Sequence, residues 1–108
     1  MPAPDAKTYV IAQVAINDRD EYDKYESADH LAIIAKFGGK PVALDEETES
    51  IEGSWPFTRT IILEFPTKDL ARSWYDSDEY QAVVGFRHRA AETNIVLVSS
   101  LPGAFGVS

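Results

Sequence analysis

The sequence predicts one α+β domain, in which a four-stranded antiparallel sheet carries its helices on one face. A length of 108 residues suffices for a single hydrophobic core. The composition, with 44% hydrophobic and 26% charged residues, is typical of a globular protein. Local patterns place strands and helices in the order β-α-β-β-α-β, which is the ferredoxin-like arrangement of split βαβ units.

The first half of the domain is predicted to contain a strand over residues 8–16 and one continuous helix over about 19–37. The segment TYVIAQVAI is β-branched and aromatic, and its alternate side chains point to opposite faces. Asp18 is a suitable N-cap for the helix, with Glu21 three residues later as in a capping box. Two glycines at 38 and 39 end the helix, because glycine readily takes the left-handed conformation there.

The other three strands are predicted over residues 40–45, 58–65 and 94–100. Pro41, at the start of the first of these, indicates an edge strand, since proline cannot donate a hydrogen bond to a neighbouring strand. The segment TRTIILEF is the clearest strand of the chain, and Pro66 stops it.

The second helical region is predicted to be split, because the segment SWYDSDEYQAVV holds a polar interruption between apolar residues. Thr67 caps a short helix that ends near Tyr75, and Ser77 caps a second helix over 78–92. Trp74 falls on the inner stripe of the short helix, so we expect it in the core. We expect the break to open a notch walled by aromatic side chains.

Residues 8–100 are predicted to form the single domain, after a flexible lead-in over residues 1–7 and before a tail over residues 101–108. The N-terminus lacks the basic and apolar stretches of a secretion signal, and no apolar run reaches the roughly 18 residues of a membrane span. The chain has no cysteine, which excludes a disulfide framework and a thiol nucleophile. These features fit a cytoplasmic protein.

The net charge of −8 argues against two classes of partner. A nucleic-acid-binding protein needs cations that displace counterions from phosphates, and an anionic membrane surface likewise attracts basic segments. We therefore expect neither nucleic acid nor membrane as a partner, and we interpret the acidity as favouring solubility.

The predicted sheet has helices on one face only, so its other face would expose apolar residues such as Ile11 and Ile62. A monomer rarely leaves an apolar patch of this size open to water. The sequence therefore predicts a symmetric homodimer, in which two sheets pack face to face and form a barrel-like core. We expect a pocket between the sheet and the split helix.

Arg87 is the most informative candidate for ligand binding. It shares one helical face with Tyr80, Val83 and Val84, so we expect its guanidinium to point toward the core together with this apolar stripe. One interpretation is a structural ion pair or a side chain whose charged end reaches water. The other is an anchor for a ligand that carries a carboxylate or an enolate.

His30 and Glu64 are the candidate catalytic residues. Glu64 is on the face of its strand opposite Leu63 and Phe65, so we expect it at the dimer core or its rim. There it would act as a base or pair with an arginine. His30 lies almost opposite the apolar stripe of the first helix, so we expect it to be exposed, although it titrates near neutrality and could serve as a general base.

Trp55, Tyr75 and Tyr80 complete the candidate ligand-binding residues, since large aromatic side chains line pockets as well as cores. Trp55 precedes Pro56 in a turn, and we expect it to be a lid or a dimer contact. Tyr75 is expected to point its hydroxyl into the cleft at the helix break, near Arg87.

No metal and no cofactor are expected. The two histidines lack the spacing of metal ligands, and the carboxylates are scattered along the chain. The paired glycines end a helix instead of beginning one, so they do not form a phosphate-binding loop, and there is no nucleophile elbow.

The chain resembles the domain-of-unknown-function-1330 family in four segments: YVIAQV, KFGGKPV, IEGSWPFTRTIILEFPT and ARSWYDSDEYQAVVGFRHRA. The resemblance covers about residues 8–100, and the motifs occur in the order that is usual for the family. Thr67 replaces a commoner serine, Asp78 replaces a frequent proline, and the tail after residue 101 is additional. Either residue at position 78 suits the first turn of a helix.

The resemblance implies the dimeric α/β-barrel superfamily, whose members include cofactor-free monooxygenases, lactone isomerases, haem-degrading enzymes and chlorite dismutases. A shared fold transfers none of these chemistries. One reading is an enzyme, monooxygenase-like or isomerase-like, that acts without metal or nucleotide on a small anionic or aromatic molecule. The alternative is a non-catalytic homodimer that binds small molecules or serves in a stress response.

Overall fold

The computed structural model describes residues 7–27 and 29–101. The predicted lead-in and tail, apart from Lys7 and Leu101, lie outside these ranges. In the described part of the chain no helix has both the length and the apolar character that crossing a membrane requires. The elements are β1 (Thr8–Ile16), α1 (Arg19–Ser27), α2 (His30–Lys36), β2 (Lys40–Asp45), β3 (Arg59–Phe65), α3 (Lys68–Asp76), α4 (Asp78–Ala90) and β4 (Ala91–Ser99).

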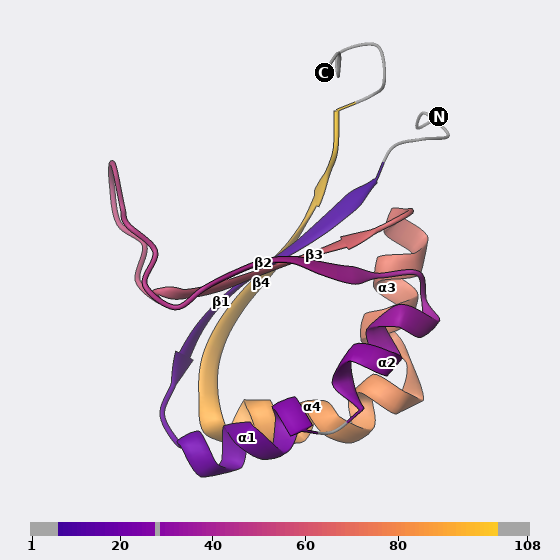
Figure 1. Cartoon of the computed structure of the whole chain (residues 1–108), viewed down its shortest axis with the longest axis horizontal. Coiled ribbons are helices and arrows are strands. Elements are labelled where there is room, and N and C mark those ends of the chain that lie inside the picture. Colours follow the sequence, from indigo (N-terminus) through magenta and orange to yellow (C-terminus); the bar gives the residue numbers. More distant parts are fainter. Residues whose placement is uncertain (1–6, 28, 102–108) are drawn as a thin grey trace.

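The four strands form one antiparallel sheet in the order β2-β3-β1-β4. The helices lie on one side of this sheet, and the β2–β3 loop projects away from them (Figure 1). Val10 of the central strand β1 pairs with Leu63 of β3 and with Leu97 of β4. This is the ferredoxin-like α+β fold that the sequence predicts.

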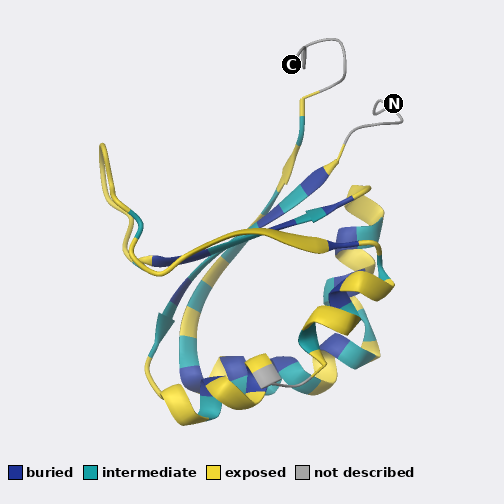
Figure 2. Ribbon diagram, viewed as in Figure 1, coloured by how far each residue is buried: buried dark blue, intermediate teal, exposed yellow. Residues whose placement is uncertain are grey.

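The hydrophobic core lies between the sheet and the helices, where Figure 2 shows most of the buried positions. The strands contribute Val10, Val14, Leu63 and Phe65 to the core. Half of the side chains that the helices contribute are aromatic, namely Tyr22, Tyr25, Trp74 and Tyr80, and the others are Ile34, Ala71, Val84 and Ala90. Trp74 is only 2% exposed, which confirms its predicted place in the core.

The opposite face of the sheet carries no helix among the described residues (Figure 1). On this face Ile11 pairs with Ile62 of β3 and with Val96 of β4. Val96 and Val98 are 53% and 42% exposed. The apolar patch predicted for this side is therefore present, and we name it the bare face, defined by Ile11, Ile62, Val96 and Val98.

The prediction of one continuous helix over residues 19–37 is wrong. α1 ends at Ser27, and α2 begins at His30 after Asp29, whose backbone angles of φ −63° and ψ 48° depart from helical values. The two helices run in different directions (Figure 1). Because a periodicity of 3.6 residues holds only within one helix, the stripe drawn along α1 does not continue into α2.

The boundary between the last helix and the last strand also differs from the prediction. α4 ends at Ala90 and β4 begins at Ala91, three residues before the predicted start of the strand. Ala91 pairs with Ile16 at the far end of β1. Helical periodicity alone places Ala91 and Glu92 in the helix. In the structure both residues pair with β1, which provides hydrogen-bond partners for this part of the backbone.

Both predicted caps of the split helix are confirmed. The Thr67 hydroxyl accepts a hydrogen bond of 3.1 Å from the backbone N–H of Leu70. The Ser77 hydroxyl accepts one of 3.1 Å from the backbone N–H of Tyr80. The second bond starts α4 with only Ser77 between it and α3, and the Tyr80 side chain is buried in the core.

Candidate ligand-binding site

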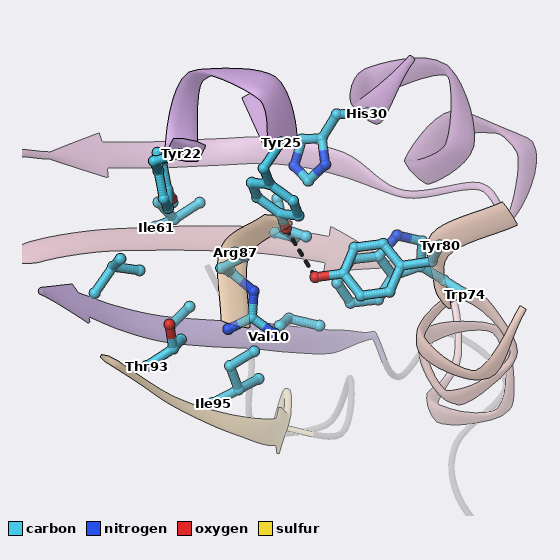
Figure 3. A pocket seen from close by; sticks show the side chains of 13 residues that line it. Val10, Tyr22, Tyr25, His30, Ile61, Trp74, Tyr80, Arg87, Thr93 and Ile95 are labelled. Carbon is cyan, nitrogen blue, oxygen red and sulfur yellow. Dashed lines mark hydrogen bonds between the residues drawn. The ribbon is translucent and has the colours of Figure 1, made fainter. Parts of the chain in front are cut away.

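A small cavity lies between the helices and the sheet (Figure 3). Its volume is about 40 Å³, which suffices for a few water molecules or for the head of a ligand. Apolar side chains of β1, β3 and β4 form one wall, and Tyr25, Trp74 and Tyr80 form much of the other. We name this space the inner cavity.

Tyr25 and Tyr80 join their hydroxyls in a hydrogen bond of 2.8 Å inside the inner cavity (Figure 3). Tyr25 comes from α1 and Tyr80 from α4, so the bond connects two helices that are distant in sequence. Burial raises the pKa of Tyr80 and raises that of Tyr25 well above its ordinary value. Both side chains are therefore neutral at pH 7, and each hydroxyl can donate and accept a hydrogen bond.

His30 lines the inner cavity, and the expectation that it is exposed is wrong. The centre of its ring lies 4.6 Å from that of Tyr25 and 6.3 Å from that of Tyr80. Its Nδ1 is buried and has no hydrogen-bond partner among the described residues. Burial, together with the positive charge of Arg87, lowers the pKa of His30 to about 4, so the imidazole is neutral at pH 7.

Arg87 enters the inner cavity from α4 and is only 4% exposed, as the helical spacing predicts. Its guanidinium carbon lies 5.8 Å from the centre of the Tyr25 ring. Within the described residues no carboxylate pairs with it, whereas Arg59, which is also buried, pairs with Glu26 and Glu46. The interpretation of Arg87 as half of a structural ion pair therefore has no support in this part of the chain.

Buried polar atoms without a partner gather at the inner cavity. In the described ranges there are six such side-chain atoms, and five of them belong to residues that line this cavity. Those five are Tyr22 Oη, His30 Nδ1, Trp74 Nε1, Arg87 Nε and Thr93 Oγ1. A buried polar group that makes no hydrogen bond costs about 1–3 kcal/mol, so such a cluster is typical of a site that a polar molecule occupies.

A larger hollow of about 460 Å³ adjoins the inner cavity. Arg87, Thr93 and Ile95 line both spaces, so the guanidinium stands at their junction. Tyr75 lines this outer hollow from α3, with its ring centre 5.5 Å from that of Tyr80. The structure thus brings Tyr75 and Arg87 to one space beside the helix break, where the sequence predicts them.

Glu64 lies away from the inner cavity. Its neighbours Leu63 and Phe65 are buried against the helices, so its own side chain points to the other side of the sheet. There Lys7 and Lys40 approach its carboxylate to 3.5 and 3.7 Å, and the expected pairing with an arginine is wrong. The sheet therefore separates Glu64 from His30 within one chain.

Trp55 also lies outside the inner cavity. It is 42% exposed in the β2–β3 loop, and its Nε1 donates a hydrogen bond of 3.0 Å to the hydroxyl of Thr60. Within a single chain it is therefore no lid over the inner cavity, and its predicted role as a dimer contact stays a prediction.

Four further residues of the site, Tyr22, Tyr25, Trp74 and Thr93, were not candidates from the sequence. Tyr22 and Tyr25 belong to the apolar stripe of the first helix, and such a stripe indicates a core. Thr93 falls between the predicted helix and the predicted strand. The sequence holds one chemical signal for the aromatic residues among them. A tyrosine or tryptophan on a buried stripe carries one polar atom that needs a hydrogen-bond partner inside the protein.

The chemical groups around the inner cavity suit an anion. They are an imidazole, hydroxyls, an indole N–H and a guanidinium, with no carboxylate among the lining side chains. In the described part of the chain no group of three His, Asp or Glu side chains converges as a metal site. A guanidinium presents several N–H donors to carboxylate-like or enolate-like oxygens.

Three solved structures share this fold. A protein of unknown function from Rhodopseudomonas palustris is 14% identical, with a TM-score of 0.75 over 90% of this chain and 84% of that one. A dimeric ferredoxin-like protein of unknown function from Jannaschia sp. is 10% identical, with a TM-score of 0.66 over 85% and 97%. SnoaB, a cofactor-independent oxygenase from Streptomyces nogalater, is 14% identical, with a TM-score of 0.60 over 90% and 94%. At these identities the likeness shows the fold alone.

A comparison with curated proteins finds no match. The sequence model of one family, described as a domain of unknown function (DUF1330), matches residues 7–101. This match spans the whole sheet, all the helices and the residues around Arg87. The chain therefore belongs to the DUF1330 family.

Proposed function

We propose that the inner cavity binds the anionic head of a small molecule and that Arg87 is the counter-ion for this head. The observation that carries the proposal is a buried guanidinium without a carboxylate partner among the described residues, surrounded by other unpartnered polar atoms. An uncompensated buried charge costs several kcal/mol. A negatively charged ligand would offset that cost when it binds.

The sizes of the two spaces favour a ligand that is divided between them. A volume of about 40 Å³ accepts a compact group such as a carboxylate or an enolate oxygen. The outer hollow, at about 460 Å³, has room for a ring or a short chain beside Tyr75 and Ile95. The aromatic neighbours favour a planar body. The ligand class is therefore a small anionic head on an apolar or aromatic body.

A metal- and nucleotide-independent enzyme is the reading that this geometry supports best. A neutral imidazole with a free ring nitrogen near the proposed head is suited to move a proton, so His30 remains the candidate base. Cofactor-independent oxygenation and isomerisation of enolisable molecules both use such a proton transfer. SnoaB, which has this fold, is described as a cofactor-independent oxygenase.

The alternative is binding without turnover, as in a protein that sequesters a small molecule or serves in a stress response. The position of Glu64 favours this alternative. The second candidate base lies on the other side of the sheet, which leaves His30 as the base at the inner cavity. A protein that only binds would return its ligand unchanged.

We also propose that the protein is a homodimer joined through the bare face. Exposed Val96 and Val98 beside Ile11 and Ile62 form a patch that a second copy would cover. The protein of the same fold from Jannaschia sp. is described as dimeric. Glu64 lies on this side of the sheet, so its predicted catalytic role would be exercised at the interface between the two copies.

Thermal unfolding in the presence of single compounds tests the ligand proposal. Carboxylic acids, phenols and enolisable ketones with aromatic bodies are the compounds to screen, because a ligand of the folded state raises the Tm. The rise should vanish in Arg87→Met and persist in Arg89→Met, which removes an exposed arginine from the same helix. A rise that survives Arg87→Met contradicts the proposal. Mass spectrometry of the stabilising compound after incubation then separates an enzyme from a binding protein.

A further inference from the structure

We propose that the site takes up a weak acid together with its proton, with the anionic oxygen held beside Arg87 and the proton held on His30. The inference rests on the proposed ligand site and adds the class of ligand. The ligand is a phenol, an enol or a carboxylic acid that can arrive undissociated, as opposed to a permanently charged anion such as a sulfonate.

The arrangement of four side chains supports a path for this proton. In Figure 3 the hydrogen-bonded hydroxyls of Tyr25 and Tyr80 lie between His30 and the guanidinium of Arg87. The ring of Tyr25 lies near both, at 4.6 Å from the His30 ring and 5.8 Å from the Arg87 guanidinium carbon. An acid beside Arg87 can exchange its proton with this pair, because each hydroxyl both accepts and donates. Neither hydroxyl bonds to His30 Nδ1, so the last transfer goes directly from the acid or through a water molecule in the inner cavity.

His30 is free to receive that proton. Its Nδ1 is buried and has no hydrogen-bond partner among the described residues. In the tautomer that carries hydrogen on Nε2, this nitrogen offers a lone pair to the cavity. A proton that arrives at Nδ1 therefore displaces no existing hydrogen bond.

Few charged or titratable groups face His30. α1 contributes Tyr22 and Tyr25 to the inner cavity, and α4 contributes Tyr80 and Arg87. The lining side chains of α3 and of the strands carry no titratable group. Burial raises the pKa of all three tyrosines, so Arg87 is the one charge at pH 7 among the described side chains that line the cavity.

This charge distribution couples the ligand to the proton. In the free protein a proton on His30 would place a second positive charge near Arg87 inside a buried space, which opposes protonation. An anion beside Arg87 reverses the balance, because it compensates the guanidinium and attracts the imidazolium. The anion and the proton therefore stabilise each other, and they enter together without a change in net charge.

The transfer itself is a simple acid–base step. The O–H bond of the acid breaks, its electron pair stays on the oxygen, and an N–H bond forms at Nδ1 of His30. No group is oxidised or reduced. For an enol or a phenol, the product is the electron-rich anion that reacts most readily at carbon, so the step would prepare the ligand for chemistry.

4-Nitrophenol is a suitable probe, because its anion is yellow and its neutral form is not. We would add it to the full-length protein in unbuffered salt solution at about pH 6, below the ordinary pKa of imidazole and of the probe. Absorbance reports the anion that forms on binding, and a pH electrode reports any proton released to the solution. We expect the wild-type protein to form the bound anion without releasing a matching proton.

Two histidine variants identify the proton acceptor. His30→Gln keeps a polar side chain but cannot hold the proton, so it should release one proton for each anion formed or fail to form the anion. His88→Gln removes the only other histidine of the chain, which lies on α4 at the wall of the outer hollow and outside the inner cavity. It can weaken binding of the probe, but the bound anion should retain its proton as in the wild type. In His88→Gln the NMR signals of the remaining imidazole should shift to those of imidazolium when the probe binds.

Three outcomes overturn the inference and leave the ligand site intact. They are release of one proton per bound anion by the wild-type protein, binding of the probe in its colourless form, and proton retention by His30→Gln. A different pair of outcomes overturns the proposed function itself. These are no saturable binding of the probe by the wild-type protein, and binding by Arg87→Met as tight as that of the wild type.

Discussion

The hydroxyl oxygens of Tyr25 and Tyr80 lie 2.8 Å apart, although 55 residues separate them in the sequence. Their hydrogen bond joins α1 to α4 inside the core, beside His30 and Arg87. The same contact therefore stabilises the packing of two helices and positions the polar groups of the inner cavity. This double role makes the pair the first target for mutation.

Tyr80→Phe should lower the free energy of unfolding by about 1–2 kcal/mol, because the Tyr25 hydroxyl then stays buried without a partner. Tyr25→Phe should have a similar effect for the same reason. The double variant should lose less than the sum, since the second removal leaves no hydroxyl unpaired. Urea denaturation of the four proteins measures these values, and strict additivity would show that the two hydroxyls do not interact in solution.

Arg87→Met should not destabilise the ligand-free protein. The substitution replaces an uncompensated buried charge by an apolar side chain of similar length, which is neutral or stabilising in comparable cases. Arg59→Met is the matched comparison, because Arg59 is also buried but pairs with Glu26 and Glu46. It should cost about 1–3 kcal/mol. Urea denaturation in which Arg87→Met loses more stability than Arg59→Met would refute the idea that the charge of Arg87 is uncompensated by a carboxylate.

Acidification from pH 7 to pH 4 should destabilise the wild-type protein more than it destabilises His30→Gln. The pKa of His30 is about 4 in the folded protein because of burial and Arg87, whereas the ordinary value of 6.5 applies to the unfolded chain. Between these values the unfolded state binds a proton that the folded state does not, so stability falls as the pH drops through this window. The difference between the two proteins should approach about 3 kcal/mol near pH 4. Denaturation curves at several pH values measure it, and identical pH profiles would show that His30 is not buried in its neutral form.

Val96→Lys should turn the proposed dimer into a monomer, because it places a charge on the apolar patch that the second copy would cover. Leu31→Lys is the matched control, since Leu31 is 63% exposed but lies on α2, on the other side of the sheet from the bare face. Light scattering after size-exclusion chromatography gives the mass of each protein. A wild-type particle of 12.0 kDa at micromolar concentration would exclude the dimer.

Gly39→Ala should destabilise the protein through packing. A Cβ at this position would lie 2.4 Å from the Phe65 ring and 2.8 Å from Ile34, and overpacking of a core costs about 1–3 kcal/mol. Gly53→Ala is the comparison, because a Cβ there meets nothing within 4 Å and the cost comes from its φ of +75°. That backbone cost is about 1–2 kcal/mol. Urea denaturation that finds Gly39→Ala fully stable would show that the core rearranges around the new methyl group.

Much of the fold could be predicted because the signals are local. The alternation in TYVIAQVAI, the caps at Thr67 and Ser77 and the helical spacing that turns Arg87 inward each depend on residues within a few positions of one another. The break between α1 and α2 has no comparable signal, since Asp29 makes no side-chain capping bond. Extending the stripe of α1 past this break therefore predicts an exposed His30, whereas the structure places this candidate base at the inner cavity.

The order of the strands and helices, the buried aromatic stripe and the inward arginine all follow from the amino-acid sequence alone. Periodicity and capping act within one element and need no knowledge of its neighbours. That His30 and Arg87 lie on opposite sides of the Tyr25–Tyr80 pair (Figure 3), with Glu64 behind the sheet, does not follow from local patterns and comes from the folding of the whole chain. Those relationships depend on how α1 and α2 pack against α4 and on which side of the sheet the helices lie, and contacts between elements far apart in the chain set that packing.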